Sequence, residues 1–240
     1  MSYTVILPTL NENGHIVKLI QTIEEIFINT KIPYEVLVID DNSTDGTQNK
    51  IKSICQKNKK IEYIFRKNAN GIGSAHKKGI IWAIKNQFDI CITMDTDGTH
   101  DPKLIKYMIK QINNRNFEII STNRFFIKNS MKYWPLHRIF LTKLRYYLVS
   151  FFLNTKLDSS GGFRAYNLRK IKYKDFFISK NNSYFFLIES LFYFEKLKYK
   201  IKELPIKLNP RAYEKSKMQL KHILSSLINL LILKINNIFN

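Results

Sequence analysis

Residues 34–46 read YEVLVIDDNSTDG, and this stretch decides the fold class. Its first six residues form a near-continuous apolar run, which is typical of a strand buried on both faces of a sheet. The acidic and polar residues that follow predict a turn that caps the next helix. A doubly buried strand that leads into a helix predicts an α/β fold with a parallel sheet covered by helices.

The same rhythm extends in both directions from this stretch. Apolar runs predict further strands over residues 3–7, 61–65, 89–94 and 117–121. Helices are predicted between them, one from Asn11 or Asn13 to about residue 30 and another over residues 74–86. This order of elements predicts a mostly parallel, Rossmann-like sheet flanked by helices.

The second half of the chain has a different character. Helices are predicted over residues 133–154, 184–193 and 220–239, and a short strand follows a glycine-containing turn that begins at residue 158. Residues 201–208 predict an edge strand, because Pro205 interrupts them. Without a repeat or a linker, we expect one domain over 1–218 and a C-terminal amphipathic helix over 219–240 that packs on the domain or lies at a membrane interface.

Composition limits the classes of function. Hydrophobic residues make up 45% of the chain, which excludes a disordered protein. The 39 Lys and Arg against 19 Asp and Glu give a net charge of +20, which indicates nucleic acid, an anionic membrane or a phosphorylated substrate as partner, or simply a well-solvated surface.

Location can also be predicted from the chain. Cys55 and Cys91 have no metal or redox spacing, so we expect a reduced, cytoplasmic setting. We also expect neither a signal peptide nor a transmembrane helix, because no apolar run is long enough.

Acidic and polar side chains follow three of the predicted strands, at residues 8–12, at Asp40 and Asp41, and at residues 95–97. Ligands of open parallel sheets bind at the carboxyl ends of the strands. Asp95 and Asp97 form a D-x-D pattern directly after a buried strand, and hard oxygen ligands suit Mg²⁺ or Mn²⁺ carrying a diphosphate. The alternative for any one of these aspartates is a helix cap, which we favour for Asp45.

Several blocks of sequence resemble family 2 glycosyltransferases of the GT-A fold: PTLNE at 8–12, VIDDNSTDGT at 38–47 and MDTD at 94–97. Three further blocks resemble the dolichol-phosphate (polyprenyl-phosphate) mannose synthase branch: GIGSA at 71–75, DSSGGFRAY at 158–166 and RAYEKSK at 211–217. The resemblance covers residues 3–218, and it implies a metal-dependent, inverting transferase. Its donor would be a nucleotide-sugar, GDP-mannose in this branch, and its acceptor a polyprenyl phosphate.

The resemblance also implies residue roles. Asp95 and Asp97 would hold the metal and the diphosphate, and Arg124 would reach phosphate groups. Catalysis would involve Asp97 together with Arg211 and Lys217 on a mobile loop that also carries Ser216. The other positions matched to substrate binding are Pro8, Thr9, Glu12, Asp40, Asp41, Gly73 and Arg164.

Two residues depart from the family pattern. Thr99 stands where the family usually has a metal-side glutamine, and Glu214 stands where it usually has glycine. Both departures bear on the exact substrate and activity. Glu189 matches a family glutamate for which we expect a structural or sugar-binding role.

An ionised lipid phosphate needs little help from a general base, so we expect positional and electrostatic catalysis rather than catalysis by His76 or His100.

Residues 139–153 combine aromatic rings with Arg138, Lys143 and Arg145, which predicts peripheral docking on the cytoplasmic face of a membrane, with a small membrane anchor subunit as a possible partner. Nucleic acid is not expected as a partner.

Alternative functions remain open at this point. A related transferase could use a UDP-sugar or a glycan hydroxyl, although a hydroxyl acceptor would demand a carboxylate base. A basic module that binds membranes or nucleic acid without catalysis, or a degenerate transferase, would not need Asp95 and Asp97.

Overall fold

A computed structural model of the protein describes residues 1–28, 32–68, 71–210 and 220–238. Its centre is a seven-stranded sheet with the strand order β3-β2-β1-β4-β6-β5-β7. The strands are β1 (Tyr3–Thr9), β2 (Tyr34–Asp40), β3 (Ile61–Phe65), β4 (Ile90–Thr93), β5 (Ile119–Asn123), β6 (Arg164–Asn167) and β7 (Ile201–Pro205).

The pairing of the strands confirms the mostly parallel sheet. β1 pairs in parallel with both β2 and β4, β2 with β3, and β5 with β7. The short strand β6 runs antiparallel to both β4 and β5. Strand β7 lies at one edge, as its proline predicts.

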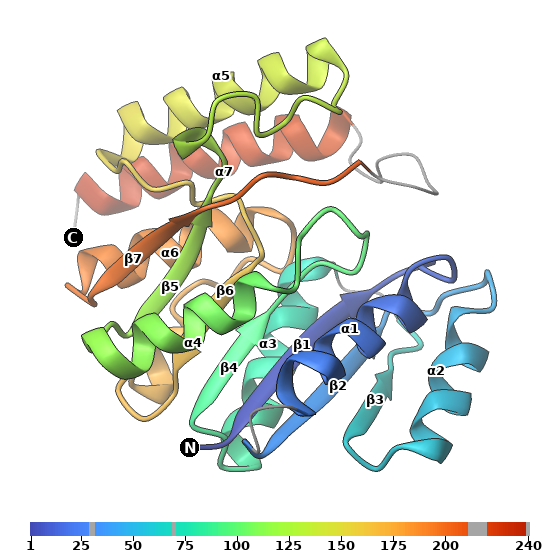
Figure 1. Ribbon diagram of the computed structural model, residues 1–240. Helices are drawn as coiled ribbons and strands as arrows, with labels where there is room; N and C mark the ends of the chain where they lie inside the picture. Colours follow the sequence, from blue (N-terminus) through green and yellow to red (C-terminus); the bar gives the residue numbers. More distant parts are fainter. Residues whose placement is uncertain (29–31, 69–70, 211–219, 239–240) are drawn as a thin grey trace.

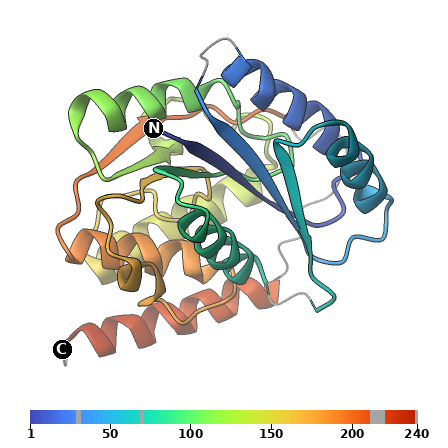
Figure 2. The same cartoon turned by 90° about the horizontal axis from the view of Figure 1, so that it is seen from below.

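Helices cover the sheet on both faces (Figure 2). They are α1 (Ile16–Ile28), α2 (Thr47–Lys57), α3 (Ile72–Lys85), α4 (Leu104–Arg115), α5 (Leu136–Leu153), α6 (Phe185–Lys196) and α7 (Leu220–Ile238), with short 3-10 turns η1 (Arg124–Phe126) and η2 (Tyr173–Phe177). Helix α4 was not among the predicted helices, and its Ile105, Met108 and Ile112 are buried at helical spacing.

The alternation of side chains along the central strands separates two hydrophobic cores. Val5 and Leu7 of β1 point to the core that contains α1 and α4, whereas Ile6 points to the core that contains α3 and α6. Helix α3 lies close to the sheet at Gly79, because a Cβ atom there would lie 2.3 Å from the side chain of Ile6. This close packing brings the beginning of α3 near the strand ends.

A third layer lies beside the sheet, where α5 and α7 run next to each other (Figure 1). Leu230 and Leu233 of α7 are buried in a cluster with residues of α5 and α6. Within the part of the chain that the structure describes, no helix combines the length and the apolar character needed to cross a membrane. The three helices α5, α6 and α7 form one wall of the cavity described next.

Candidate active site

A cavity of about 610 Å³ opens at the carboxyl ends of the central strands and continues between α5, α6 and α7. Of the residues predicted for the site, seven line this cavity: Pro8, Thr9, Glu12, Asp41, Asp95, Asp97 and Arg124. Parallel strands place their carboxyl ends at one edge, so residues that are far apart in sequence meet there. The cavity is therefore the candidate active site.

The ends of β1 and β2 are tied together at the floor of the cavity. The amide of Asp41 donates to the carbonyl of Thr9 over 2.9 Å, and the hydroxyl of Thr96 donates to the carbonyl of Pro8 over 3.1 Å. The amide of Glu12 donates to the Thr47 hydroxyl over 2.9 Å. These bonds fix the loops that carry the predicted nucleotide-binding residues.

The two aspartates after β2 have different surroundings. Asp40 is fully buried, does not line the cavity, and accepts hydrogen bonds from Ser43 and from the Gln48 amide. Asp41 does line the cavity, and its carboxylate pairs with both Nε and Nη2 of Arg66. The prediction that Asp40 contacts substrate stays a prediction, and in this structure its oxygens hold the turn that leads to α2.

Two other predicted binding residues also lie away from the cavity. Arg164 is fully buried, and its guanidinium donates to the carbonyl oxygens of Ser159 and Leu187 over 2.6 and 2.7 Å. Gly73 packs under α6, where a Cβ atom would lie 2.5 Å from the Cβ of Phe186. Neither residue lines the cavity; in this structure both support the fold, and their roles in substrate binding stay predictions.

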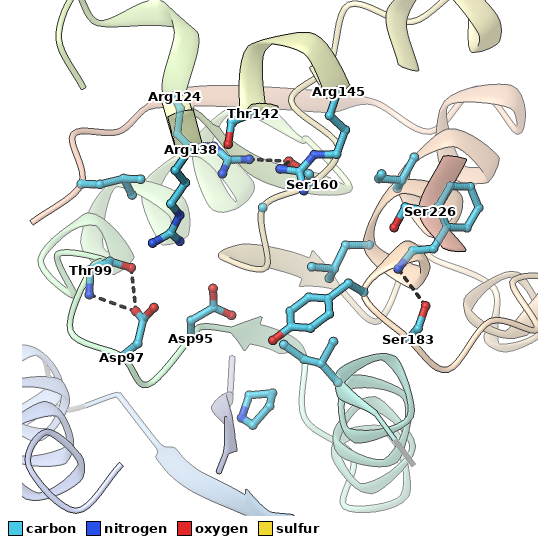
Figure 3. A pocket seen from close by; sticks show the side chains of 18 of the residues that line it. Asp95, Asp97, Thr99, Arg124, Arg138, Thr142, Arg145, Ser160, Ser183 and Ser226 are labelled. Atoms are coloured by element: carbon cyan, nitrogen blue, oxygen red, sulfur yellow. Dashed lines mark hydrogen bonds between the residues drawn. The ribbon is translucent and has the colours of Figure 1, made fainter. Parts of the chain in front are cut away.

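Asp95 and Asp97 follow β4 and both line the cavity. One oxygen of Asp97 accepts hydrogen bonds from the Thr99 amide over 3.1 Å and from the Thr99 hydroxyl over 2.6 Å, as Figure 3 shows. Thr99 is itself buried, and its carbonyl accepts from the amide of Asn209 over 2.8 Å. Thr99 thus orients the carboxylate of Asp97.

A buried ion pair lies on the opposite side of the cavity. The guanidinium of Arg124 donates from Nε and Nη2 to the two oxygens of Asp158, each over 2.8 Å, and Nη2 also donates to the Ser160 hydroxyl. Burial alone would raise the pKa of Asp158, but the charge and hydrogen bonds of Arg124 outweigh it and hold that pKa below its usual value. Asp158 in turn fixes the position of Arg124.

Helix α5 adds two cations that the sequence analysis assigned to a membrane surface. Arg138 and Arg145 both line the cavity, together with Thr142 between them. Arg145 donates to the Ser160 hydroxyl over 2.9 Å, and the Arg138 guanidinium lies 3.8 Å from the Trp134 ring centre. In Figure 3 these arginines face Asp95 and Asp97 across the cavity. Their i, i+4, i+7 spacing was the sequence signal that they share one helix face.

Three arginines against the one carboxylate of Asp158 leave this part of the cavity with an excess of positive charge. Burial, together with the nearby charges of Arg124 and Arg138 and opposed in part by Asp158, lowers the pKa of Arg145 to about 10. Arg145 still carries its charge at neutral pH. An anion placed among the three guanidinium groups would relieve their mutual repulsion, so this region suits a phosphate group.

The other predicted residues lie as follows. His100 lines the cavity and stacks on Phe163 with ring centres 5.2 Å apart, whereas His76 is buried behind it. Glu189 accepts a hydrogen bond from Ser179 over 2.5 Å and does not line the cavity. Arg211, Ser216 and Lys217, with Glu214 beside them, lie outside the described residues.

A family model described as Glycosyl transferase family 2 matches residues 4–183 of the chain. The fold and the strand-end site are those of a glycosyltransferase, and the chain belongs to this family.

Two relatives match most of the chain. An undecaprenyl-phosphate mannosyltransferase of Micrococcus luteus is 26% identical over 185 residues, which cover 77% of this chain and 75% of the relative. A polyprenol monophosphomannose synthase of Mycolicibacterium smegmatis is 24% identical over 216 residues, 89% of this chain and 80% of the relative.

Solved structures confirm the GT-A fold. Mannosyl-3-phosphoglycerate synthase from Rubrobacter xylanophilus superposes with a TM-score of 0.69 at 13% identity, over 99% of this chain and 74% of that one. Glucosyl-3-phosphoglycerate synthase from Mycobacterium tuberculosis, in complex with Mn²⁺, UDP and phosphoglyceric acid, gives a TM-score of 0.68 at 18% identity, over 97% and 78% of the two chains.

Proposed function

We propose that this chain transfers mannose from GDP-mannose to a polyprenyl phosphate, with inversion at the anomeric carbon and with Mg²⁺ or Mn²⁺. The observation that carries the proposal is the composition of the single cavity along its length. Strand-end carboxylates line one end, three arginines line the middle, and apolar side chains of α5, α6 and α7 line the other end. The names of the two relatives support the same acceptor and the same sugar.

The carboxylate end fits a divalent metal and a diphosphate. Asp95 and Asp97 supply hard oxygen atoms, and Thr99 orients Asp97. Among the described residues, no third His, Cys, Asp or Glu joins them in a cluster. This donor set suits a metal held by two carboxylates and completed by diphosphate oxygens and water, which is how Mg²⁺ is usually bound beside phosphates. The M. tuberculosis neighbour, in complex with Mn²⁺ and UDP, supports such a metal in this fold.

The middle and the far end fit a lipid phosphate. Arg138, Arg145 and Arg124 would bind the phosphate oxygens, and Thr142 lies between the two α5 arginines. Leu141 and Leu144 also line the cavity between the two α5 arginines, and its wall continues with the apolar side chains of Leu148, Phe185, Ile188 and Leu230. A prenyl chain attached to the phosphate would lie along this wall, where burial of its methylene groups is favourable.

The chemistry follows from the two anions that the cavity holds. A phosphate oxygen of the acceptor, already ionised at neutral pH, attacks the anomeric carbon and forms the new C–O bond without a general base. The bond to the nucleoside diphosphate breaks on the opposite face, and the leaving group takes the electron pair. A bound divalent metal would neutralise charge on the leaving diphosphate. The arginines hold the acceptor in line against the repulsion of the donor.

A hydroxyl acceptor is the weaker alternative. It would need a carboxylate near the arginine end to take the proton of the hydroxyl group. In the described part of the chain, Asp158 is the carboxylate that is hydrogen-bonded to Arg124, and its oxygens are already engaged by three hydrogen bonds from that residue. The arginine-lined middle of the cavity therefore favours an acceptor that is already an anion.

The test is a donor and acceptor screen with purified full-length protein. We expect product only with polyprenyl phosphate and Mn²⁺ or Mg²⁺, and the largest rate with GDP-mannose. Arg138→Ala should raise the KM for polyprenyl phosphate by about tenfold, since a charge-assisted hydrogen bond contributes about 1.5–3 kcal/mol. The KM for the donor should change little.

Equal rates with polyprenol and polyprenyl phosphate, or transfer to a soluble glycan, would contradict the lipid-phosphate acceptor. Lys132→Ala is a matched control, because Lys132 is exposed near the beginning of α5 and does not line the cavity. It should leave both KM values unchanged.

The acceptor also requires a membrane surface, and we propose that the outer face of α5 and α7 provides it. Exposed apolar side chains repeat along α5 at helical spacing, at Leu136, Phe140, Tyr147 and Phe151. On α7, Ile228, Leu231, Ile232 and Ile235 are exposed, and α7 packs against α5. The apolar end of the cavity lies between the same helices, so a lipid in the bilayer can reach it.

This surface corrects part of the sequence prediction. Phe140, Tyr147, Phe151 and Lys143 face solvent as expected. Tyr146 instead stacks on Phe125, with ring centres 4.2 Å apart. Arg138 and Arg145 line the cavity rather than snorkel, because they lie on the opposite side of the helix from Phe140 and Phe151.

We expect the protein to float with anionic liposomes at low salt. The double variant Phe140→Ser/Phe151→Ser should lower the partition coefficient of the protein between liposomes and solution by at least about tenfold. Burial of one Phe side chain contributes about 1.5–3 kcal/mol. Tyr107→Ser is the matched control, since Tyr107 is 62% exposed but lies on α4. Equal flotation of the double variant and the wild type would contradict docking through α5.

A further inference from the structure

His76 lies in the first half of α3 and is 1% exposed. Its ring is packed near the ring of Phe186, with centres 6.0 Å apart, and the Nε2 atom has no hydrogen-bond partner. Burial, with a further contribution from the charge of Arg164, lowers the pKa of His76 to about 3. The imidazole is therefore neutral at neutral pH and carries one N–H group.

A buried imidazole nitrogen without a partner is unfavourable. Leaving such a polar group unsatisfied costs about 1–3 kcal/mol, whereas an apolar ring would pack beside Phe186 without that cost. A histidine at position 76 is therefore costly for the stability of the fold alone. A role for its Nε2 atom depends on what that atom faces.

Nε2 faces the backbone of Gly162, beside the candidate metal site. A Cβ atom on Gly162 would lie 3.5 Å from Nε2 of His76 and 2.8 Å from Oδ1 of Asp95. The two polar atoms therefore border the same small space, which exists because residue 162 has no side chain. A space lined by a nitrogen and a carboxylate oxygen suits a water molecule.

We propose that His76 is a positioning residue for Asp95, whose carboxylate it orients toward the metal and the diphosphate through a water beside Gly162. The Nε2–H group donates to this water, and the water donates to Oδ1 of Asp95. The other oxygen of Asp95 is then directed into the cavity. The inference rests on the proposed metal site, and it adds a residue outside the cavity lining to that site.

The test measures how much Mn²⁺ tightens nucleotide binding. Calorimetry would give the Kd of GDP, and separately of UDP, with Mn²⁺ and with EDTA, for the wild type, His76→Phe, His76→Gln and Asp97→Ala. We expect His76→Phe to lose about tenfold in the Mn²⁺ arm and nothing in the EDTA arm, because outer partners of metal ligands typically contribute about 10- to 100-fold in metal affinity. His76→Gln keeps an N–H donor at a similar distance and should retain most of the Mn²⁺ effect.

The outcomes separate two kinds of failure. If the wild type shows no Mn²⁺ effect, or one that Asp97→Ala leaves intact, the metal site itself is wrong and the inference falls with it. If Asp97→Ala removes the effect while His76→Phe behaves as the wild type, the metal site stands and His76 only fills space. Equal losses in the Mn²⁺ and EDTA arms of His76→Phe would show a packing role and overturn the inference. The Tm of His76→Phe should equal or exceed that of the wild type, since the substitution removes the unpaired nitrogen.

Discussion

Asp97→Ala is expected to lower kcat/KM by at least about 10³-fold, because it removes one of two carboxylates proposed to hold the metal and so withdraws about 4 kcal/mol of transition-state stabilisation. The Tm should stay within about 2 °C of the wild type, since the side chain lies at the cavity and outside the hydrophobic cores. The measurement is initial rate against Mn²⁺ concentration, beside a thermal melt of each protein.

Asp101→Ala is the matched control. Asp101 is an exposed carboxylate four residues further on, and it accepts a hydrogen bond from the Lys103 amide over 3.0 Å at the beginning of α4. Its loss should cost about 0.5–2 kcal/mol of stability, as for a helix cap, and leave kcat/KM unchanged. An Asp97→Ala variant with near-normal turnover would remove Asp97 from the catalytic machinery.

The sheet could be predicted because its signals are local. The apolar run that forms β2 is buried along nearly its whole length, and the polar residues after each strand begin the loops at the cavity. The direction of β6 could not be predicted in the same way. All four of its residues pair antiparallel with β4, and Ala165 and Tyr166 also pair antiparallel with β5; only the long path of the chain through α5 determines that orientation.

The site residues show where sequence reasoning ends. Asp40 and Arg164 belong to matched sequence blocks, yet their polar atoms are used inside the fold. A sequence block shows that a residue type is needed but not whether a ligand or the backbone needs it. Arg138 and Arg145 posed the opposite problem, since α5 carries exposed apolar residues as well as basic ones. Periodicity grouped them on one face, but only the packing of α5 beside α6 and α7 shows that this face lines the cavity.

Arg124→Met is expected to reduce both stability and activity. It would leave Asp158 buried without its bidentate partner, and breaking a buried pair in this way costs about 3–5 kcal/mol. Arg145 also lowers the pKa of Asp158 and compensates part of this loss, so we expect the lower end of that range. The activity should fall by about 10²-fold or more, as for the loss of one preorganised donor to a developing charge.

The two losses can be separated by a second substitution. Arg124→Met/Asp158→Asn removes the uncompensated charge as well, so it should recover most of the stability, as measured by urea unfolding. It should not recover kcat, because the guanidinium group that we propose binds the acceptor phosphate is still missing. Recovery of both quantities would show that Arg124 acts only in folding.

The pH dependence gives an independent check with a definite sign. In the wild type, the folded-state pKa of Asp158 is depressed, so the stability from the pair is present above the unfolded pKa of about 3.9 and is lost only as pH falls below it. In Arg124→Met, burial is opposed only by the charge of Arg145 and by the hydrogen bonds from the backbone amide of residue 124 and the Ser160 hydroxyl, so the folded-state pKa of Asp158 should rise above its unfolded value. Such a group stabilises the fold below the unfolded pKa and loses that contribution as pH rises. The stability gap between wild type and Arg124→Met should therefore widen from pH 4 to pH 7. A stability gap that is constant over this range would show that Arg124 does not stabilise the fold by compensating the charge of Asp158.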